Sequence, residues 1–211
     1  MNGKIDYLKL GFLLCVVCVI SGFALSVTYS VTKKRIEAQN REDILRSLPV
    51  VYPGAASFSD VKSIGGIDYY EAKNAEGKNI GYALYGGVQG YQSVIKFMVG
   101  IDLKGKISGL KILEHGETPG LGARITEIKS DETLFGYMED VFEGEGDKKK
   151  PKEPWFTQMF KSKFYKDLYV SKTDSDKSAV HAITGATITT VCVVDGVKEV
   201  VGTFLGKING R

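Results

Sequence analysis

The stretch that decides the fold runs from 67 to 115, and it consists of the segments "IDYYEAKN" (67–74), "AEGK" (75–78), "NIGYALYG" (79–86), "SVIKFMVGID" (93–102), "LKGK" (103–106) and "ISGLKILEH" (107–115). Extended runs rich in Tyr, Ile and Val alternate with polar turns that contain glycine, which is the pattern of two successive β-hairpins. Together the runs predict an antiparallel sheet with one packed face.

Helical patterns follow the predicted strands. We expect helices within "ITEIKSDETLFGYMEDVF" (125–142) and "PWFTQMFKSKF" (154–164), with Trp155 closing the core. Strands followed by helices favour one α+β domain, which we expect over residues 50–211. A last helix is expected from about Thr189 or Thr190, packed on the sheet through a stripe at helical spacing that consists of Val191, Val194, Val197, Val201 and Leu205.

The N-terminal part contains an apolar run over 10–31, "LGFLLCVVCVISGFALSVTYSV", of about 22 residues without a charge. This length is enough to cross a hydrocarbon core of roughly 30 Å as a helix. A cleavable signal peptide, processed near Ala24, is the alternative, but the run continues beyond that site and then meets the basic cluster at 33–35. We therefore expect a permanent transmembrane helix over 10–31, preceded by residues 1–9 and followed by a juxtamembrane helix or linker over 32–49.

The charge pattern is unremarkable outside this region. The net charge is +3, and the only tight basic cluster beyond the juxtamembrane segment is "KKKPK" at 148–152. Nucleic-acid binding requires a basic face with interleaved aromatic residues or a reading motif, and neither is present, so we expect no nucleic-acid partner. Lys and Arg flank both ends of the span, and charge alone does not settle its orientation.

The three cysteines cannot form a disulfide framework. Cys15 and Cys18 lie in the apolar run on neighbouring turns of one helix face, as small apolar residues or as ligands shared with another chain. Cys192 is expected to be buried rather than reactive. Three dispersed cysteines cannot supply the usual four ligands of an iron–sulfur cluster, and we predict no metal site and no catalytic residue in this chain.

A short run of small and hydroxyl residues, "TGAT" at 184–187, precedes the last predicted helix. Thr187 would stand just before the first turn, where unpaired N–H groups and the positive end of the helix dipole stabilise a phosphate. Gly185 can adopt backbone angles that other residues avoid, and Ala186 adds no bulk, so an enzyme or a ligand could approach Thr187 closely. The plainer interpretation is that Thr187 is a helix N-cap.

"TGAT" followed by "IT" and a C-terminal helix resembles the flavinylation motif [ST]-G-A-T of the FMN-binding domain family, in which the last Thr is joined to FMN through a phosphodiester. The segments "ETPGLG" (117–122) and "GYQSVIKFMVGID" (90–102) resemble the same family. With one N-terminal span ahead of them, the resemblance covers essentially the whole chain. Within the family, the arrangement is similar to the G subunits of Rnf electron-transport complexes.

The resemblance implies that Thr187 accepts FMN covalently and that Thr184, Gly185 and Ala186 form the segment that a dedicated flavin transferase recognises. It also implies that the loop over 117–122 lies beside the flavin. In this loop Gly120 and Gly122 would let backbone approach a planar ring, Leu121 would cover an apolar face, and Glu117 and Thr118 would supply polar contacts. The plainer interpretation of the loop is a turn with a surface carboxylate.

Two positions depart from the family pattern. His181 stands where the family usually has an Asp three residues before the motif, so a transferase that reads this carboxylate would modify the chain more slowly; alternatively, His181 fills the same space. Ser93 stands where relatives often carry Gly, and a small polar residue should fit there.

By resemblance, the chain is a membrane-anchored electron-transfer subunit of an ion-translocating ferredoxin:NAD oxidoreductase of the Rnf type, and an enzyme only as part of that complex. The family places the flavin domain on the extracytoplasmic side of the cell membrane, with residues 1–9 in the cytoplasm and the other subunits as partners. The C subunit of the Na⁺-translocating NADH:quinone reductase is one alternative, and a flavin-free anchored binding domain is another. A hydrolase that uses Thr187, Ser93 or His115 lacks a recognisable nucleophile motif.

Overall fold

The computed structural model of the chain describes residues 3–128, 153–173, 176 and 178–210. The chain forms two compact units, Met1–Leu45 and Arg46–Arg211. From residue 129 onward the helical pattern predicted for 125–142 lies outside the described residues, and so does the basic cluster at 148–152.

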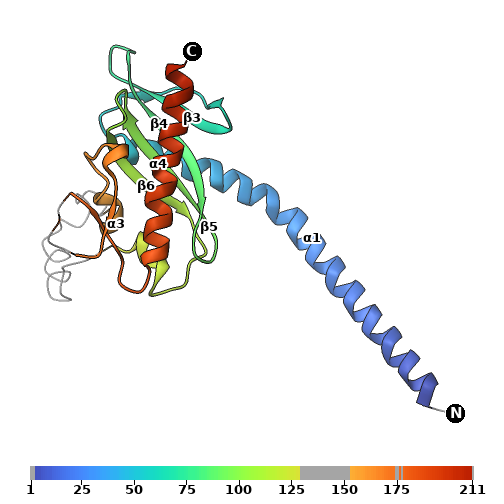
Figure 1. Ribbon diagram of the computed structural model, residues 1–211. Coiled ribbons are helices and arrows are strands. Elements are labelled where there is room, and N and C mark those ends of the chain that lie inside the picture. The colour runs from blue at the N-terminus through green and yellow to red at the C-terminus, as the bar shows by residue number, and fades with distance from the viewer. Residues whose placement is uncertain (1–2, 129–152, 174–175, 177, 211) are drawn as a thin grey trace, which may run out of the picture. The chain divides into compact units, whose positions relative to one another are not determined.

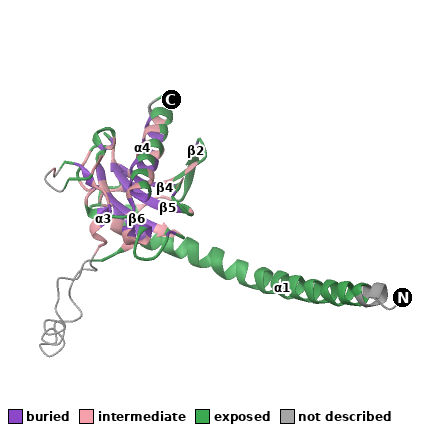
Figure 2. Cartoon of the chain, turned by 60° about the horizontal axis from the view of Figure 1, so that its bottom comes forward, coloured by how far each residue is buried: buried purple, intermediate pink, exposed green. Residues whose placement is uncertain are grey.

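Helix α1, Gly3–Val51, contains the whole apolar run. In the part of the chain that the structure describes, it is the one helix that is long and apolar enough to cross a membrane. The described side chains from Tyr7 to Asp43 are exposed (Figure 2). The hydroxyls of Thr28, Ser30 and Thr32 each donate to the carbonyl four residues earlier at 2.8–2.9 Å, so these polar groups are satisfied within the helix, as a lipid environment requires.

The second unit is built on an antiparallel sheet in which neighbouring strands follow the order β1-β3-β4-β5-β6, while β2 also pairs with β3. Both predicted hairpins, β3–β4 and β5–β6, are confirmed, and β4 pairs with β5 from Gly81 opposite Asp102 to Gln89 opposite Val94. The strands are β1 Ser57–Phe58, β2 Lys62–Ile64, β3 Ile67–Lys73, β4 Asn79–Gln89, β5 Val94–Asp102 and β6 Ile107–Glu114.

Helix α4, Thr187–Asn209, lies across one face of this sheet (Figure 1). Gly86 of β4 and Gly196 of α4 allow the close approach, because a Cβ at either position would come within 2.8 Å of a valine side chain on the other element. The prediction that Val191 belongs to the buried stripe is wrong: its side chain is 37% exposed, because it lies about 200° round the helix from Val193. The apolar side chains that α4 does bury are Val193, Val194, Val197, Val201, Phe204 and Leu205.

The last turns of α1 cover part of the opposite sheet face. The helix continues through Pro49 to Val51, two residues beyond the juxtamembrane helix or linker predicted over 32–49. Val51 is fully buried against Gly100 and Gly109, where an added Cβ would lie 2.2 and 2.8 Å from the Val51 carbonyl oxygen. Glycine on β5 and β6 therefore makes room for the end of α1.

Short elements complete the unit: the 3₁₀ helices η1 Gly122–Thr126 and η2 Tyr165–Asp167, helix α3 Trp155–Gln158, and the parallel pair β7 Val170–Ser171 and β8 Val180–His181. Phe156 and Phe160 are fully buried in the core, whereas Trp155 packs at its edge with its ring centroid 6.2 Å from that of Phe156. Helices thus pack an antiparallel sheet, and the α+β prediction is confirmed.

Candidate functional site

The start of α4 is shaped by a β-turn over Ile183–Ala186, closed by the Ala186 N–H, which donates to the Ile183 carbonyl at 2.8 Å. Gly185 occupies the third position of the turn with φ of +80°, a conformation that strains any residue with a Cβ. Helix α4 begins at Thr187, two residues before the predicted start, and Ala186 is its N-cap residue. The interpretation of Thr187 as the N-cap is therefore wrong.

The four threonines between 184 and 190 differ in what their hydroxyls do. Thr190 is fully buried; its Oγ1 accepts the Ile183 N–H at 3.1 Å and donates to the Ala186 carbonyl at 3.0 Å. Thr189 is buried too and donates to Glu117 at 2.7 Å. The hydroxyls of Thr184 and Thr187 make no hydrogen bond to the residues that the structure describes, and Thr184 is exposed whereas Thr187 is half-buried.

A cleft of about 440 Å³ opens beside this helix start, a volume within the usual range for small-molecule sites. All of the predicted site residues line it except Thr184 and Gly120, and Tyr91, Ile188 and Thr189 line it without having been predicted. The full lining is Tyr91, Glu117, Thr118, Leu121, Gly122, Gly185, Ala186, Thr187, Ile188 and Thr189.

Glu117 is the charged group of the cleft, and its side chain is only 5% exposed. Oε1 accepts the backbone N–H groups of Gln92 at 2.9 Å and Ser93 at 3.1 Å, and Oε2 accepts the Thr189 hydroxyl. Burial raises the pKa of Glu117, but the hydrogen bonds from Thr189 and the backbone outweigh burial and lower the pKa below its ordinary value. The carboxylate is therefore ionised at neutral pH, and its interpretation as a surface carboxylate is wrong.

Glycines surround this carboxylate for reasons of space. A Cβ at Gly90 would lie 2.7 Å from Glu117 Oε1, and one at Gly122 would lie 2.7 Å from Oε2. Gly120 instead serves the turn, with φ of +75° and open space around it, and it is not part of the cleft lining. A Cβ at Gly185 would lie 2.8 Å from Leu121 Cδ2, so the two predicted segments meet at this point.

Further hydrogen bonds fix the loop over 117–122 to the turn before β5. Thr118 Oγ1 donates to Gln92 Oε1 at 2.8 Å, and the Gly116 N–H donates to Ser93 Oγ at 2.6 Å. Ser93 was expected only to fit in a position where relatives often carry Gly. The structure shows that its hydroxyl also accepts a hydrogen bond. His115 Nε2 lies 3.2 Å from Thr126 Oγ1, and among the described residues no hydrogen bond joins His115 to Ser93 or Thr187, the other two residues of the hydrolase alternative.

His181, the departure from the family pattern, lies on β8 outside the cleft lining. Its Nε2 is 2.8 Å from the carbonyl oxygen of Asp176. The Asp176 carboxylate accepts hydrogen bonds from Ser178 and Tyr169, which lower its pKa to about 2. His181 therefore helps to hold the loop before β8 and does not line the cleft that contains Thr187.

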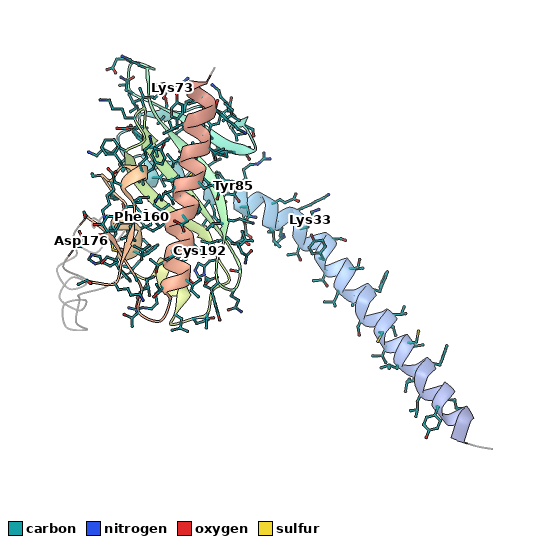
Figure 3. All side chains as sticks on the ribbon, in the orientation of Figure 1. Lys33, Lys73, Tyr85, Phe160, Asp176 and Cys192 are labelled. Atoms are coloured by element: carbon teal, nitrogen blue, oxygen red, sulfur yellow. The ribbon has the colours of Figure 1, made fainter. Side chains whose placement is uncertain are left out.

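Three large apolar side chains of the cleft are open to solvent: Tyr91, Leu121 and Ile188 are 69%, 46% and 56% exposed. Cys192 lies in the N-terminal half of α4 (Figure 3), four residues after Ile188 in the sequence. Burial, together with the negative charges of Glu117 and Asp195, raises the pKa of its thiol. The arrangement combines an unengaged hydroxyl at a helix N-terminus with exposed apolar side chains. It fits a ligand that has both a phosphate and an aromatic ring system.

Comparison with known proteins gives matches over most of the chain. A family model described as FMN-binding domain matches residues 90–202, and one described as RnfG N-terminal region matches residues 1–51. The G subunit of the proton-translocating ferredoxin:NAD(+) oxidoreductase complex of Clostridium ljungdahlii is 32% identical over 193 residues, which cover 89% of this chain and 86% of that protein.

The G subunit of the Na(+)-translocating ferredoxin:NAD(+) oxidoreductase complex of Acetobacterium woodii is 30% identical over 208 residues, covering 90% of this chain and 87% of that protein. Among solved structures, that of NqrC from Shewanella oneidensis is similar with a TM-score of 0.46 and 18% identity, covering 76% of this chain and 74% of that chain.

Proposed function

The chain belongs to the FMN-binding domain family, among the G subunits of ion-translocating ferredoxin:NAD(+) oxidoreductase complexes, and from that premise we propose that it is a membrane-anchored electron-transfer subunit of such a complex. Helix α1 is the anchor, with its apolar residues 10–31 in the lipid bilayer. The chain acts as one relay within a redox enzyme and is not a catalyst by itself.

The cofactor is FMN, bound covalently to Thr187 through a phosphodiester. One observation supports this assignment above the others: of the four threonines between 184 and 190, Thr187 alone lines the cleft with a hydroxyl that makes no hydrogen bond to a described residue. The helix start supplies unpaired N–H groups to a phosphate at this hydroxyl, and Tyr91, Leu121 and Ile188 supply apolar surface to a ring. Bound FMN supplies the electron-transfer chemistry.

The covalent bond joins Thr187 Oγ1 to the phosphorus of the flavin phosphate. The flavin donor is activated as a phosphoanhydride: Oγ1 gives up its proton and bonds to the flavin phosphorus, the anhydride P–O bond breaks, and the other half of the anhydride departs as a phosphate. We assign this exchange to a flavin transferase, which is the maturation partner of the chain. Gly185 and Ala186 leave the approach to Thr187 open, because neither has a side chain larger than a methyl group. Exposed Thr184, outside the cleft, is available to the transferase as part of its recognition segment.

The flavin domain lies on the extracytoplasmic side of the membrane, and the chain crosses the membrane once. The other subunits of the complex supply the iron–sulfur clusters, since three cysteines cannot provide the usual four ligands. The covalent bond keeps the flavin on an open cleft from which a dissociable FMN would be lost.

In-gel flavin fluorescence after denaturation tests the assignment. The full-length chain is produced together with a flavin transferase that is shown to modify another substrate in the same cells. We expect a fluorescent band for the wild type and for Thr187→Ser, and none for Thr187→Ala. Thr203→Ala is the matched control, because Thr203 is an exposed threonine on the C-terminal half of α4, and its band should match the wild type.

A wild-type band without fluorescence would refute covalent attachment and favour the alternative of a flavin-free anchored binding domain. A fluorescent Thr187→Ala band would place the flavin elsewhere. The proteins that co-purify with the chain distinguish the complexes: ferredoxin:NAD oxidoreductase partners are expected, and NADH:quinone reductase partners would favour the alternative complex.

A further inference from the structure

Glu117 is a buried anion without a cationic partner among the described residues. Its side chain is 5% exposed, and its oxygens accept hydrogen bonds from N–H and O–H donors. Buried carboxylates are normally paired with a cation, because the desolvation of an isolated charge is strongly unfavourable. A buried anion kept in the wall of a binding cleft therefore calls for an explanation beyond stability.

The carboxylate joins parts of the chain that are distant in sequence. Oε1 binds the backbone at Gln92 and Ser93, 25 and 24 residues away, and Oε2 binds Thr189, 72 residues away. Tyr91, next to the first pair, and Thr189 both line the cleft. Glu117 thus bonds the turn before β5 to the first turn of α4 through one side chain.

The residues around the Glu117 carboxylate leave room for both of its oxygens and donate hydrogen bonds to both. Gly90 and Gly122 each leave room for one oxygen, and any Cβ there would approach it to 2.7 Å. Backbone N–H groups and a threonine hydroxyl can all donate, and only an ionised carboxylate accepts at both oxygens without a proton of its own. The first turn of α4 adds the positive end of the helix dipole.

We propose that Glu117 is a positioning residue of the cleft, which acts as an ionised carboxylate that holds the 91–93 turn to the first turn of α4 and places a fixed negative charge against the bound flavin. The part that concerns the flavin rests on the function proposed above. The charge already acts on a neighbouring group, since Glu117 is one of the causes that raise the pKa of Cys192, after burial. A fixed negative charge disfavours the addition of electrons to a redox group beside it.

Two substitutions separate the charge from the shape. Glu117→Gln keeps the size of the side chain and removes its charge. Glu114→Gln is the matched control, because Glu114 is an exposed carboxylate three residues earlier that pairs with Lys96 across the sheet at 2.6 Å and does not line the cleft. Both are made in the full-length chain in detergent.

Hydrogen exchange of the flavin-free chain tests whether the Glu117 carboxylate holds the 91–93 turn to the first turn of α4. In Glu117→Gln, we expect the amides of Gln92 and Ser93 to exchange about tenfold faster than in the wild type, because a charge-assisted hydrogen bond becomes a neutral one. Glu114→Gln should exchange like the wild type in this segment. Unchanged exchange at Gln92 and Ser93 in Glu117→Gln would overturn the proposal.

Redox titration of the flavin-loaded chain tests the electrostatic part, which a merely structural role would not affect. We expect Glu117→Gln to shift the equilibrium between oxidised and reduced flavin about tenfold toward reduced, which is about 30 mV for a two-electron couple. Glu114→Gln should leave the equilibrium unchanged. An unshifted equilibrium in Glu117→Gln, or an equal shift in both variants, would overturn the proposal.

A second pair keeps the test decisive if Glu117→Gln does not fold. Thr189→Val removes the donor to Oε2 and keeps the shape, whereas Thr189→Ser keeps the hydroxyl. We expect faster amide exchange at Gln92 and Ser93 in Thr189→Val and the wild-type exchange rate in Thr189→Ser. Equal exchange in the two variants would contradict the proposal that Glu117 holds the 91–93 turn to α4. Because the exchange experiments need no flavin, a wild-type chain that carries none would refute the proposed function and leave this test intact.

Discussion

The loop over 117–122 and the segment over 184–190 line the same cleft and are built in opposite ways. In the loop, the charged group is buried, and both oxygens of Glu117 accept hydrogen bonds. In the segment, Thr187 lines the cleft with a hydroxyl that makes no hydrogen bond to a described residue. The glutamate, which has the more conspicuous chemistry, therefore supports the cleft, whereas the threonine carries the hydroxyl to which we assign the flavin.

The segment can leave Thr187 available because its neighbours perform the structural tasks. Thr190 binds both ends of the Ile183–Ala186 turn through one hydroxyl, and Thr189 binds the loop. Three threonines within four residues therefore have three different environments. Substitutions that disturb one side of the cleft at a time can separate these roles.

The largest effect on stability is expected from Gly122→Ala, which forces the two sides apart. The new Cβ would lie 2.7 Å from Glu117 Oε2 and 2.9 Å from Thr189 Oγ1, and these atoms are held by a hydrogen bond to each other. We expect the free energy of unfolding to fall by about 3 kcal/mol in urea denaturation.

Gly206→Ala is the matched control for that substitution. Gly206 is exposed on α4 with nothing within 4 Å of an added Cβ, and alanine there should stabilise the helix by up to about 1 kcal/mol. Equal losses of stability in the two variants would show that the close packing around Glu117 does not matter.

The second prediction compares the same change at two positions. Thr190→Val leaves the buried Ile183 N–H without its acceptor and should lower the free energy of unfolding by about 2 kcal/mol. Thr187→Val removes a hydroxyl that bonds to no described residue, and we expect a loss below about 0.5 kcal/mol in the flavin-free chain. Thermal denaturation of both variants checks this, and a larger loss for Thr187→Val would reverse the comparison.

A smaller effect is expected from Ser93→Gly, which acts on the loop side alone. The Gly116 N–H would lose its acceptor, and the loss of stability should be about 1 kcal/mol in urea denaturation. Fluorescent labelling at Thr187 by the transferase should remain at the wild-type level, because the 184–190 segment is untouched. Loss of labelling in this variant would mean that the hydrogen bond between Gly116 and Ser93 is also needed to present Thr187.

The smallest effect is expected from pH. Because the pKa of Glu117 in the folded chain lies below its ordinary value of 4.5, the unfolded chain binds more protons near that pH. The stabilisation is present above about pH 4.5 and is lost as the pH falls through the folded pKa. Between about pH 6 and about pH 3, the melting temperature of the wild type should therefore fall further than that of Glu117→Gln. Parallel curves would contradict an ionised buried carboxylate.

The strands were predictable because their information is local. Alternating apolar residues and the glycine turns at 75–78 and 103–106 defined both hairpins, and the structure places β3 to β6 on the same segments. The start of α4 was predicted two residues late because Thr187, Thr189 and Thr190 are all acceptable N-caps by type. The role of each threonine is set by its hydrogen-bond partner: Thr189 donates to Glu117, and Thr190 accepts from Ile183. The bond between Thr189 and Glu117 joins residues 72 positions apart, so a local pattern does not reveal it.

The cleft was predictable only in part, for the same reason. Glycine and threonine patterns indicated both segments. Tyr91 and Ile188 lie within or beside the stretches that resemble the family, but their residue types did not mark them as part of a site, since an exposed apolar residue has many ordinary explanations. The sequence also could not show that Gly122 makes room for the Glu117 carboxylate, because that role rests on distances between segments.

The most direct test of the central claim is tandem mass spectrometry of the tryptic peptide 178–198 from the flavin-loaded wild-type chain. The peptide contains five side-chain hydroxyls, those of Ser178, Thr184, Thr187, Thr189 and Thr190, so fragmentation assigns the attachment to one of them. We expect FMN phosphate on Thr187 alone. Flavin on Thr184, or on either buried threonine, would contradict the proposal that the flavin is attached at the start of α4, to the cleft hydroxyl that bonds to no described residue.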